Sequence, residues 1–201
     1  MQDDIKERIV RIAADKFFQH GITKVTLDEI AEEAGMSKKT VYKYFEGKDD
    51  LLKAVIQHQL QLVEGKISEL VQQQEAFETK VGMILLIFGQ QVGRIGRQFI
   101  TDLQRFFPKQ WKEIENFRRE KIFLHLKRMF QQGQQEGVFR SDISAELFYL
   151  VLTAAIQGVA TPKVLSEHSF SVTQAIRGIF RILLEGAFTQ PAQKRIHTFL
   201  D

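Results

Sequence analysis

The chain has 201 residues, of which 44% are hydrophobic and 26% charged, and its formal net charge is +3. These values are ordinary for a globular protein and allow one or two domains around a substantial buried core. The absence of cysteine excludes disulfides, thiolate nucleophiles and cysteine metal sites, and it suits the reducing cytoplasm, where we expect the protein to lie.

Neither a signal peptide nor a membrane partner is expected. Charged residues interrupt the early apolar positions, and the longest uncharged apolar stretch, near residues 81–88, is too short to cross a bilayer. Apolar residues recur at helical spacing, and several consecutive segments of β-type alternation are missing. The sequence therefore predicts an all-α fold.

The first fifty residues predict three helices with recognisable ends. An apolar face at helical spacing forms the first helix, and Gly21 ends it because glycine adopts the left-handed cap conformation at little cost. Thr26 and Glu29 have the spacing of a capping box that begins the second helix, which Gly35 ends. Ser37 is placed to cap a third helix at about residues 38–45.

The third predicted helix is short and presents lysines and tyrosines to solvent. Val41 and Phe45 lie one turn apart, so we expect them to anchor it to the first two helices. Residues 1–50 carry a net charge of −2, but residues 37–48 carry +3. Lysine and tyrosine can bind phosphates, lysine can also donate to guanine, and threonine can contact a thymine methyl group. This predicts a helix that enters the major groove, with DNA-binding candidates Thr26, Ser37, Lys38, Lys39, Thr40, Tyr42, Lys43, Tyr44 and Lys48.

Two other hypotheses stay open, because caps, glycine turns and lysine-rich faces are each common. One is a non-specific DNA-organising protein, and the other is a helical enzyme that uses the helix pair for protein contacts. The sequence shows no nucleophile with a recognisable base, and its five histidines lack metal-ligand spacing. We therefore expect no catalytic site, no cofactor and no structural metal.

Residues 21–56, GITKVTLDEIAEEAGMSKKTVYKYFEGKDDLLKAVI, resemble the DNA-binding domain of the tetracycline-repressor (TetR/AcrR) family of transcriptional regulators. The resembling positions include Phe17, Gly21, Thr26, Ile30, Ala31, residues 34–37, residues 40–42, Tyr44, Phe45, Lys48, Leu51 and Leu52. Lys39 departs from the pattern, since many relatives carry a small residue there, often glycine or alanine.

The resemblance implies a helix-turn-helix DNA-binding domain at residues 1–48. A long helix would join it to a helical ligand-binding and dimerisation domain at residues 49–201. It also implies a homodimer that binds a near-palindromic double-stranded DNA operator and responds to a small effector, with repression as the expected outcome.

The middle of the chain is rich in phenylalanine and basic residues. Nine of seventeen phenylalanines fall between residues 77 and 139, and residues 89–140 carry a net charge of +6. A phenylalanine-rich core with solvated basic faces explains this most simply. The functional alternative is an aromatic pocket for a small hydrophobic effector, and the charge excess hints at an anionic one. The candidate pocket residues are Phe88, Phe99, Phe106, Phe107, Trp111, Phe117, His125, Met129 and Tyr149.

A glycine series at residues 89, 93 and 96 follows the apolar stretch of residues 81–88. Its spacing fits no phosphate-binding loop, and no second strand follows in a strand–helix–strand order. It predicts close helix packing or a local helix irregularity, and nucleotide binding is not expected.

The last two predicted helices, at residues 145–160 and 169–188, carry more apolar surface than one core needs. The first has no charge after Glu146 and is apolar nearly all round, so one side requires a further partner. A helix inside a larger monomer core is one explanation. We favour a two-fold four-helix interface, which the family resemblance also implies. The candidate interface residues are Phe148, Leu152, Ala155, Val159, Ile176, Ile179, Phe180, Leu183 and Ala187.

Overall fold

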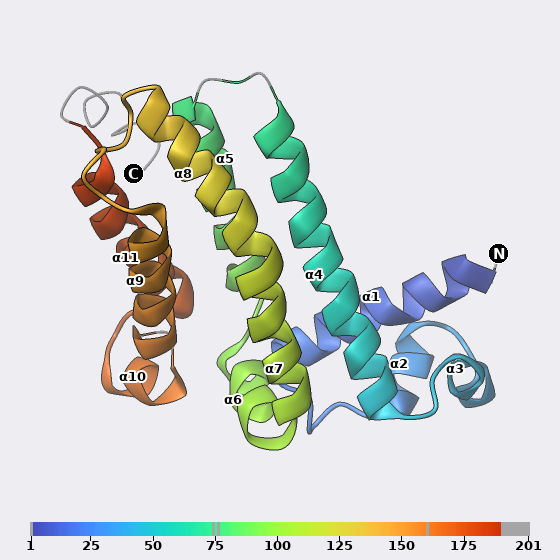
Figure 1. Ribbon diagram of the computed structural model, residues 1–201. Helices are drawn as coiled ribbons and strands as arrows, with labels where there is room; N and C mark the ends of the chain where they lie inside the picture. Colours follow the sequence, from blue (N-terminus) through green and yellow to red (C-terminus); the bar gives the residue numbers. More distant parts are fainter. Residues whose placement is uncertain (1, 74, 76, 160, 190–201) are drawn as a thin grey trace. The chain divides into compact units, whose positions relative to one another are not determined.

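The structure is a computed structural model and describes residues 2–73, 75, 77–159 and 161–189. In this part of the chain the helices are α1 (Gln2–His20), α2 (Leu27–Glu33), α3 (Lys38–Tyr44), α4 (Lys48–Gln72), α5 (Phe77–Gly93), α6 (Arg97–Phe106), α7 (Pro108–Phe117), the π-helical η1 (Arg118–Ile122), α8 (Phe123–Gln135), α9 (Ala145–Val159), α10 (Pro162–Glu167) and α11 (Val172–Ala187) (Figure 1). An isolated antiparallel bridge joins Phe139 and Phe188, and the all-α prediction is confirmed. The helices of these ranges include none that is long and apolar enough to span a membrane.

Local sequence signals set the helix ends of the N-terminal region. The Glu29 amide donates to Thr26 Oγ1 at 3.2 Å, and the Thr26 amide donates to Glu29 Oε2 at 2.7 Å, so the predicted capping box begins α2. Ser37 caps α3 as predicted. Gly21 and Gly35 follow α1 and α2 with φ of +86° and +61°, the left-handed conformation that favours glycine.

Packing divides the chain into two compact units. Met1–Val63 and Arg94–Asn116 form the first unit, and Glu64–Gly93 and Phe117–Asp201 form the second. The first unit therefore contains α6 and nearly all of α7 in addition to the N-terminal helices. The boundary expected at residues 48–49 separates two expected functions, does not coincide with this division by packing, and stays a prediction.

The first unit has a core of aliphatic and aromatic side chains from α1 to α4. Phe17, Phe45 and Leu51 are among its fully buried members. Helix α6 joins this core through Phe99, whose ring meets that of Phe18 edge-on with centroids 4.9 Å apart. α6 and α1 therefore share one hydrophobic core.

The core of the second unit is built around phenylalanines. The Phe139 ring stacks on Phe130 and Phe188 at centroid distances of 4.4 and 5.1 Å, and it meets Phe77 edge-on at 5.2 Å. A Cβ at Gly133 would lie 2.6 Å from Phe77 Cζ, so this aromatic packing requires a residue without a side chain on α8.

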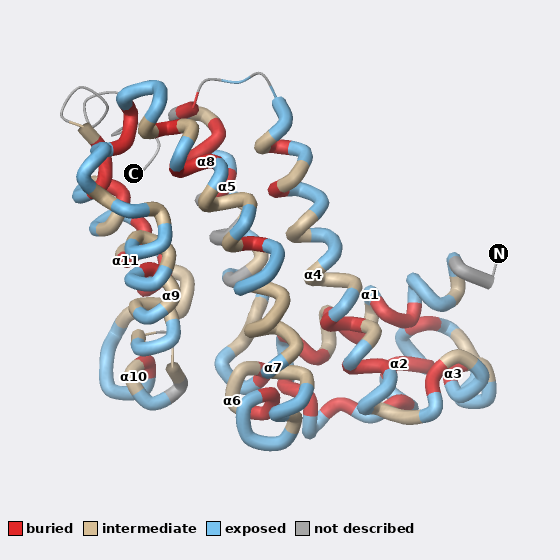
Figure 2. Tube along the Cα trace, viewed as in Figure 1, coloured by how far each residue is buried: buried red, intermediate tan, exposed pale blue. Residues whose placement is uncertain are grey.

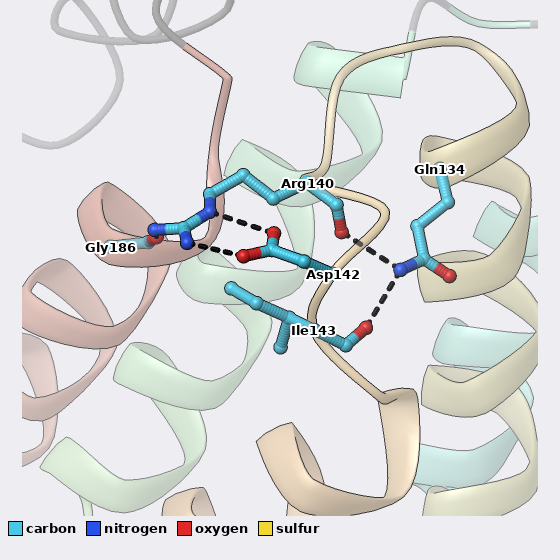
Figure 3. Close-up of polar contacts among 5 residues, drawn as sticks. All are labelled: Gln134, Arg140, Asp142, Ile143 and Gly186. Carbon is cyan, nitrogen blue, oxygen red and sulfur yellow. Dashed lines mark hydrogen bonds and ion pairs between the residues drawn. The ribbon is translucent and has the colours of Figure 1, made fainter.

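The connection between α8 and α9 is fastened to the end of α11 (Figure 3). The Arg140 amide donates to the Ala187 carbonyl at 2.9 Å, and its guanidinium pairs with Asp142, which holds the pKa of that carboxyl below its ordinary value. Gln134 Nε2 donates to the carbonyls of Arg140 and Ile143 at 2.8 and 2.7 Å. These bonds fix where α9 begins relative to α11.

Candidate nucleic-acid interface

Helix α3 is anchored on one side and open on the other. Val41 and Phe45 are 0% and 2% exposed, and both belong to the core of the first unit. The exposed residues of the helix are Lys38, Lys39, Tyr42 and Lys43. A short helix held by two apolar residues therefore presents three ammonium groups and a phenol to solvent, which suits recognition of a polyanion.

The hydroxyl candidates contribute to helix caps. Thr26 is exposed and caps α2, and Ser37 caps α3. The Ser37 and Thr40 hydroxyl oxygens lie 2.8 Å apart, within hydrogen-bond distance. These residues fix the beginning of each helix and hence the direction in which α3 presents its exposed side.

Lys38 pairs with Asp28 of α2, and both side chains are largely exposed. Exposed pairs of this kind typically contribute about 0–1 kcal/mol, so a phosphate can replace the carboxylate at small cost. Tyr44 is half-buried and packs against the core of the first unit. Its aromatic ring therefore serves the packing of α3.

Lys48, the first residue of α4, is held by the α1–α2 loop. Its ammonium nitrogen donates to the carbonyls of Ile22 and Thr23, each at 3.1 Å. The sequence predicted a phosphate contact for Lys48. In the structure, the Lys48 ammonium group instead donates two hydrogen bonds to backbone carbonyls of the protein.

Asp102 of α6 is a buried charged residue of this unit that is not among the residues predicted from the sequence. It is 1% exposed and accepts hydrogen bonds from the Thr23 amide and hydroxyl and from Gln98 Nε2. Burial by itself raises the pKa of Asp102, but these hydrogen bonds and the backbone at Ile22 outweigh it and hold the pKa below its ordinary value. A usable sequence signal was an acid at a core position of the apolar pattern Phe99, Asp102, Leu103.

The nine candidate pocket residues fall into both compact units. Phe99, Phe106, Phe107 and Trp111 belong to the first unit, and Phe117, His125, Met129 and Tyr149 belong to the second. The side chain of Phe88 lies outside the described residues. The structure does not bring the nine together within either unit, and the pocket stays a prediction.

Several of these side chains have neighbours of their own. Phe99 and Met129 are buried in their units, whereas Phe106 is 53% exposed beside Arg105. Tyr149 packs against Phe123 and donates its hydroxyl to the Arg118 carbonyl at 3.2 Å. Burial raises the pKa of the Tyr149 phenol.

The candidate interface residues on α9 and α11 lie in or against the core of the second unit. Leu152, Ile176, Ile179, Phe180 and Ala187 are buried there, and Phe148, Ala155, Val159 and Leu183 are partly buried against it. The exposed large apolar residues of the two helices are different ones, Leu147, Leu150 and Val151 on α9 and Ile182 on α11. Figure 2 shows α9 mostly as exposed or intermediate. The two-fold interface itself stays a prediction.

The residues that the structure describes include no group of three or more His, Cys, Asp or Glu side chains that could hold a metal ion. The arrangement in the first unit is therefore one of basic and aromatic groups on a short helix, supported by caps and backbone hydrogen bonds.

Comparison with known proteins identifies the same region. Residues 9–55 match the family model for bacterial regulatory proteins of the tetR family. The chain is 23% identical over 163 residues to YvaF of Bacillus subtilis, an uncharacterized HTH-type transcriptional regulator, covering 80% of this chain and 84% of that protein. It is 22% identical over 167 residues to the probable acrEF/envCD operon repressor of Escherichia coli K12, covering 77% and 73%.

The fold is also that of solved regulators. A solved gamma-butyrolactone receptor (ArpA-like protein) matches with a TM-score of 0.65 at 16% sequence identity, covering 100% of this chain and 96% of that one. Residues 9–55 are therefore a DNA-binding domain of the tetR family, and similarity to transcriptional regulators over most of the chain identifies the protein as a TetR-type transcriptional regulator rather than an enzyme.

Proposed function

We propose that the protein is a ligand-responsive repressor that binds a near-palindromic operator as a homodimer. The observation that carries the proposal is the exposed side of α3, with three lysines and Tyr42 opposite the buried anchors Val41 and Phe45. In this proposal residues 1–48 bind DNA, and residues 49–201 bind the effector and a second copy of the chain. The protein acts in the cytoplasm.

At the operator, α3 enters the major groove. Lys39, Tyr42 and Lys43 contact base edges and phosphates, and Lys38 exchanges Asp28 for a phosphate. Thr26, Ser37 and Thr40 hold α2 and α3 in register, and Tyr44 packs α3 against the unit. Two such helices in one dimer would occupy successive major grooves roughly 34–36 Å apart.

Dimerisation is supported by the apolar surface of the second unit. Leu150 is 62% exposed and Ile182 is 72% exposed, on two helices that pack against each other. Leu147, Leu150 and Val151 are spaced by three and four residues and therefore share one side of α9. A second copy of the chain would cover this side, and the partly buried Phe148, Ala155, Val159 and Leu183 would lie beneath it.

The effector is proposed to be small and hydrophobic. The phenylalanine-rich sequence of residues 77–139 supports a hydrophobic ligand, and the net charge of +6 over residues 89–140 favours an anionic group on it. One solved structure of similar fold is a receptor for gamma-butyrolactone, and one relative is a probable operon repressor. An effector can release DNA only through different affinities for the DNA-bound and the free conformation.

A competition binding assay tests the proposal. Purified full-length protein is bound to DNA that flanks its own coding region, with scrambled DNA as competitor. A specific regulator should prefer the flanking DNA by about 10³ or more. Equal loss of binding to scrambled DNA would establish a non-specific binder instead, and absence of binding at low salt would overturn the proposal. The same complex then serves to screen small hydrophobic acids for release of DNA.

A further inference from the structure

Thr23, in the loop between α1 and α2, is bound by two charged side chains. Its amide and hydroxyl donate to Asp102 Oδ2 at 2.8 and 2.9 Å. Its carbonyl accepts from Lys48 Nζ at 3.1 Å, as does the carbonyl of Ile22. Both backbone polar groups of one loop residue are therefore held by charges from two other helices, α6 and α4.

The carboxylate end of this arrangement is buried and well supplied with donors. Asp102 is 1% exposed, and Gln98 Nε2 donates to its second oxygen at 2.7 Å. A buried carboxylate is tolerated only where hydrogen bonds replace its lost hydration, and charge-assisted bonds are stronger than neutral ones. Thr23 cannot move away without leaving that charge poorly solvated, so Asp102 defines the position of the loop.

Glycines allow the close approach on which these bonds depend. A Cβ at Gly21 would lie 2.4 Å from Gln98 Cγ and 3.0 Å from Asp102 Oδ2. A Cβ at Gly96, just before α6, would lie 2.7 Å from the Phe18 carbonyl oxygen. The end of α1 and the beginning of α6 therefore pack closely because both positions lack a side chain.

We infer that Asp102, Thr23 and Lys48 form a clamp that holds the α1–α2 loop where α2 and α3 can dock on DNA. The loop leads directly to Thr26, the N-cap of α2, and α2 packs against α3. A displaced loop therefore displaces the recognition helix. Asp102 and Lys48 are positioning residues for DNA binding, and Asp102 lies outside the residues 9–55 that match the family model. The inference rests on the DNA binding proposed above.

The direction in which Asp102→Asn changes DNA affinity distinguishes the clamp from simple electrostatics. Asp102→Asn removes a negative charge from the DNA-binding unit, so charge alone predicts tighter binding to DNA. The clamp predicts weaker binding, by roughly 10-fold, because charge-assisted bonds to Thr23 are lost. Thr23→Val removes only the hydroxyl donor at an exposed position and should weaken binding by roughly 5-fold. The double variant should lose less than the product of the two effects, since both break the same contact.

Lys48 gives an independent measurement. If its ammonium bound a phosphate, Lys48→Gln would lower the slope of log affinity against log salt by about 0.9 per subunit. The clamp predicts that affinity falls while this slope stays unchanged. Glu113→Gln is the control for Asp102→Asn, because it also neutralises an acid of the first unit. Glu113 of α7 accepts a hydrogen bond from Gln57 Nε2, and its substitution leaves the loop contacts intact.

The experiment uses full-length protein and a duplex that the wild type selects from a random-sequence pool. Dissociation constants are measured between 50 and 200 mM salt, well below the melting temperature of each variant, and circular dichroism verifies that each is folded. Weaker binding by Asp102→Asn and Thr23→Val, with the control unchanged, supports the clamp. Equal or tighter binding, or a lower melting temperature with unchanged affinity, overturns it. A wild type that enriches no sequence would instead overturn the proposed function.

Discussion

The amide of Gly96 donates a 2.8 Å hydrogen bond to the carbonyl of Phe18, and a Cβ at Gly96 would lie 2.7 Å from that oxygen. Because the oxygen belongs to the backbone of α1, it cannot swing aside as the end of a flexible side chain could. The contact between α1 and α6 therefore depends on the absence of a side chain at residue 96. Gly96 is the last of the three glycines for which the sequence predicted close helix packing or a local helix irregularity, and at this position close packing is what the structure shows.

Gly96→Ala is expected to lower the free energy of unfolding by about 1–3 kcal/mol, as overpacking of a close contact does. Urea unfolding followed by circular dichroism measures it. Gly65→Ala is the matched control, since Gly65 lies within α4 and a Cβ there meets no atom within 4 Å. That change should stabilise the protein by about 0.5–1 kcal/mol, because alanine favours a helix over glycine. Equal effects of the two changes would contradict the close-contact explanation.

Lys39 tests whether the exposed side of α3 lies at the DNA backbone. Lys39→Gln should weaken binding to every duplex and lower the salt slope by about 1 per subunit, or about 2 per dimer, if its ammonium neutralises a phosphate. Fluorescence anisotropy at several salt concentrations measures the slope. An unchanged slope with altered sequence preference would assign Lys39 to a base instead.

Tyr42 tests the same surface without a change of charge. Tyr42 is 54% exposed, so Tyr42→Ala should leave folding and dimerisation unchanged and weaken operator binding by roughly 5- to 10-fold, the effect of one lost hydrogen bond. Sedimentation velocity checks the assembly, and anisotropy checks the affinity. Loss of dimerisation in this variant would show that the surface has been assigned to the wrong partner.

Asp102 should make the free energy of unfolding fall at acidic pH. Its pKa in the folded protein lies below the ordinary value, so its ionised form stabilises the fold. That stability is fully present above the pKa of the unfolded chain, and it is lost as the pH falls below about 4 and through the folded pKa. Asp102→Asn should therefore flatten the dependence of unfolding free energy on pH in this acidic range.

Glu146→Gln provides the comparison for this pH effect. Hydrogen bonding to Lys127 also lowers the pKa of Glu146, but the pair is exposed. High salt should suppress the contribution of Glu146 and leave that of the buried Asp102 in place. Urea unfolding at several pH values, with and without 0.5 M salt, would separate the two; a salt-sensitive Asp102 effect would contradict its buried role.

The helices and their caps were predictable because they depend on neighbouring residues. Thr26 and Glu29 are three residues apart, and Gly21 and Gly35 follow the apolar patterns they end. The contacts of Asp102 and Lys48 with Thr23 were not predictable, because they join residues 79 and 25 positions apart. A local pattern indicates that Asp102 occupies a core position, but it does not reveal which hydrogen-bond donors stabilise the buried carboxylate.

The orientation of α9 shows a second limit of local patterns. Since nearly every residue after Glu146 is apolar, hydrophobic periodicity does not decide which side faces the core of the unit. Leu152 was predicted as an interface residue, and the structure buries it at 3% exposure in the core of the second unit. Packing against α8 and α11 decides which side of α9 faces the core, and it leaves Leu147 and Leu150 exposed.

Leu150→Glu should convert the proposed dimer to a monomer. A charge at a position that a second copy covers would be buried without a partner, at a cost large enough to dissociate a dimer of micromolar or weaker affinity. Leu86→Glu is the matched control, because Leu86 of α5 is 59% exposed, close to the 62% of Leu150, and receives the same substitution. Sedimentation velocity should give a monomer for Leu150→Glu and a dimer for wild type and Leu86→Glu. Operator affinity should fall with the dimer, because one subunit reads only one half-site. If Leu150→Glu stayed dimeric, the interface could not lie on this side of α9. If Leu86→Glu became monomeric, the interface would be assigned to α5.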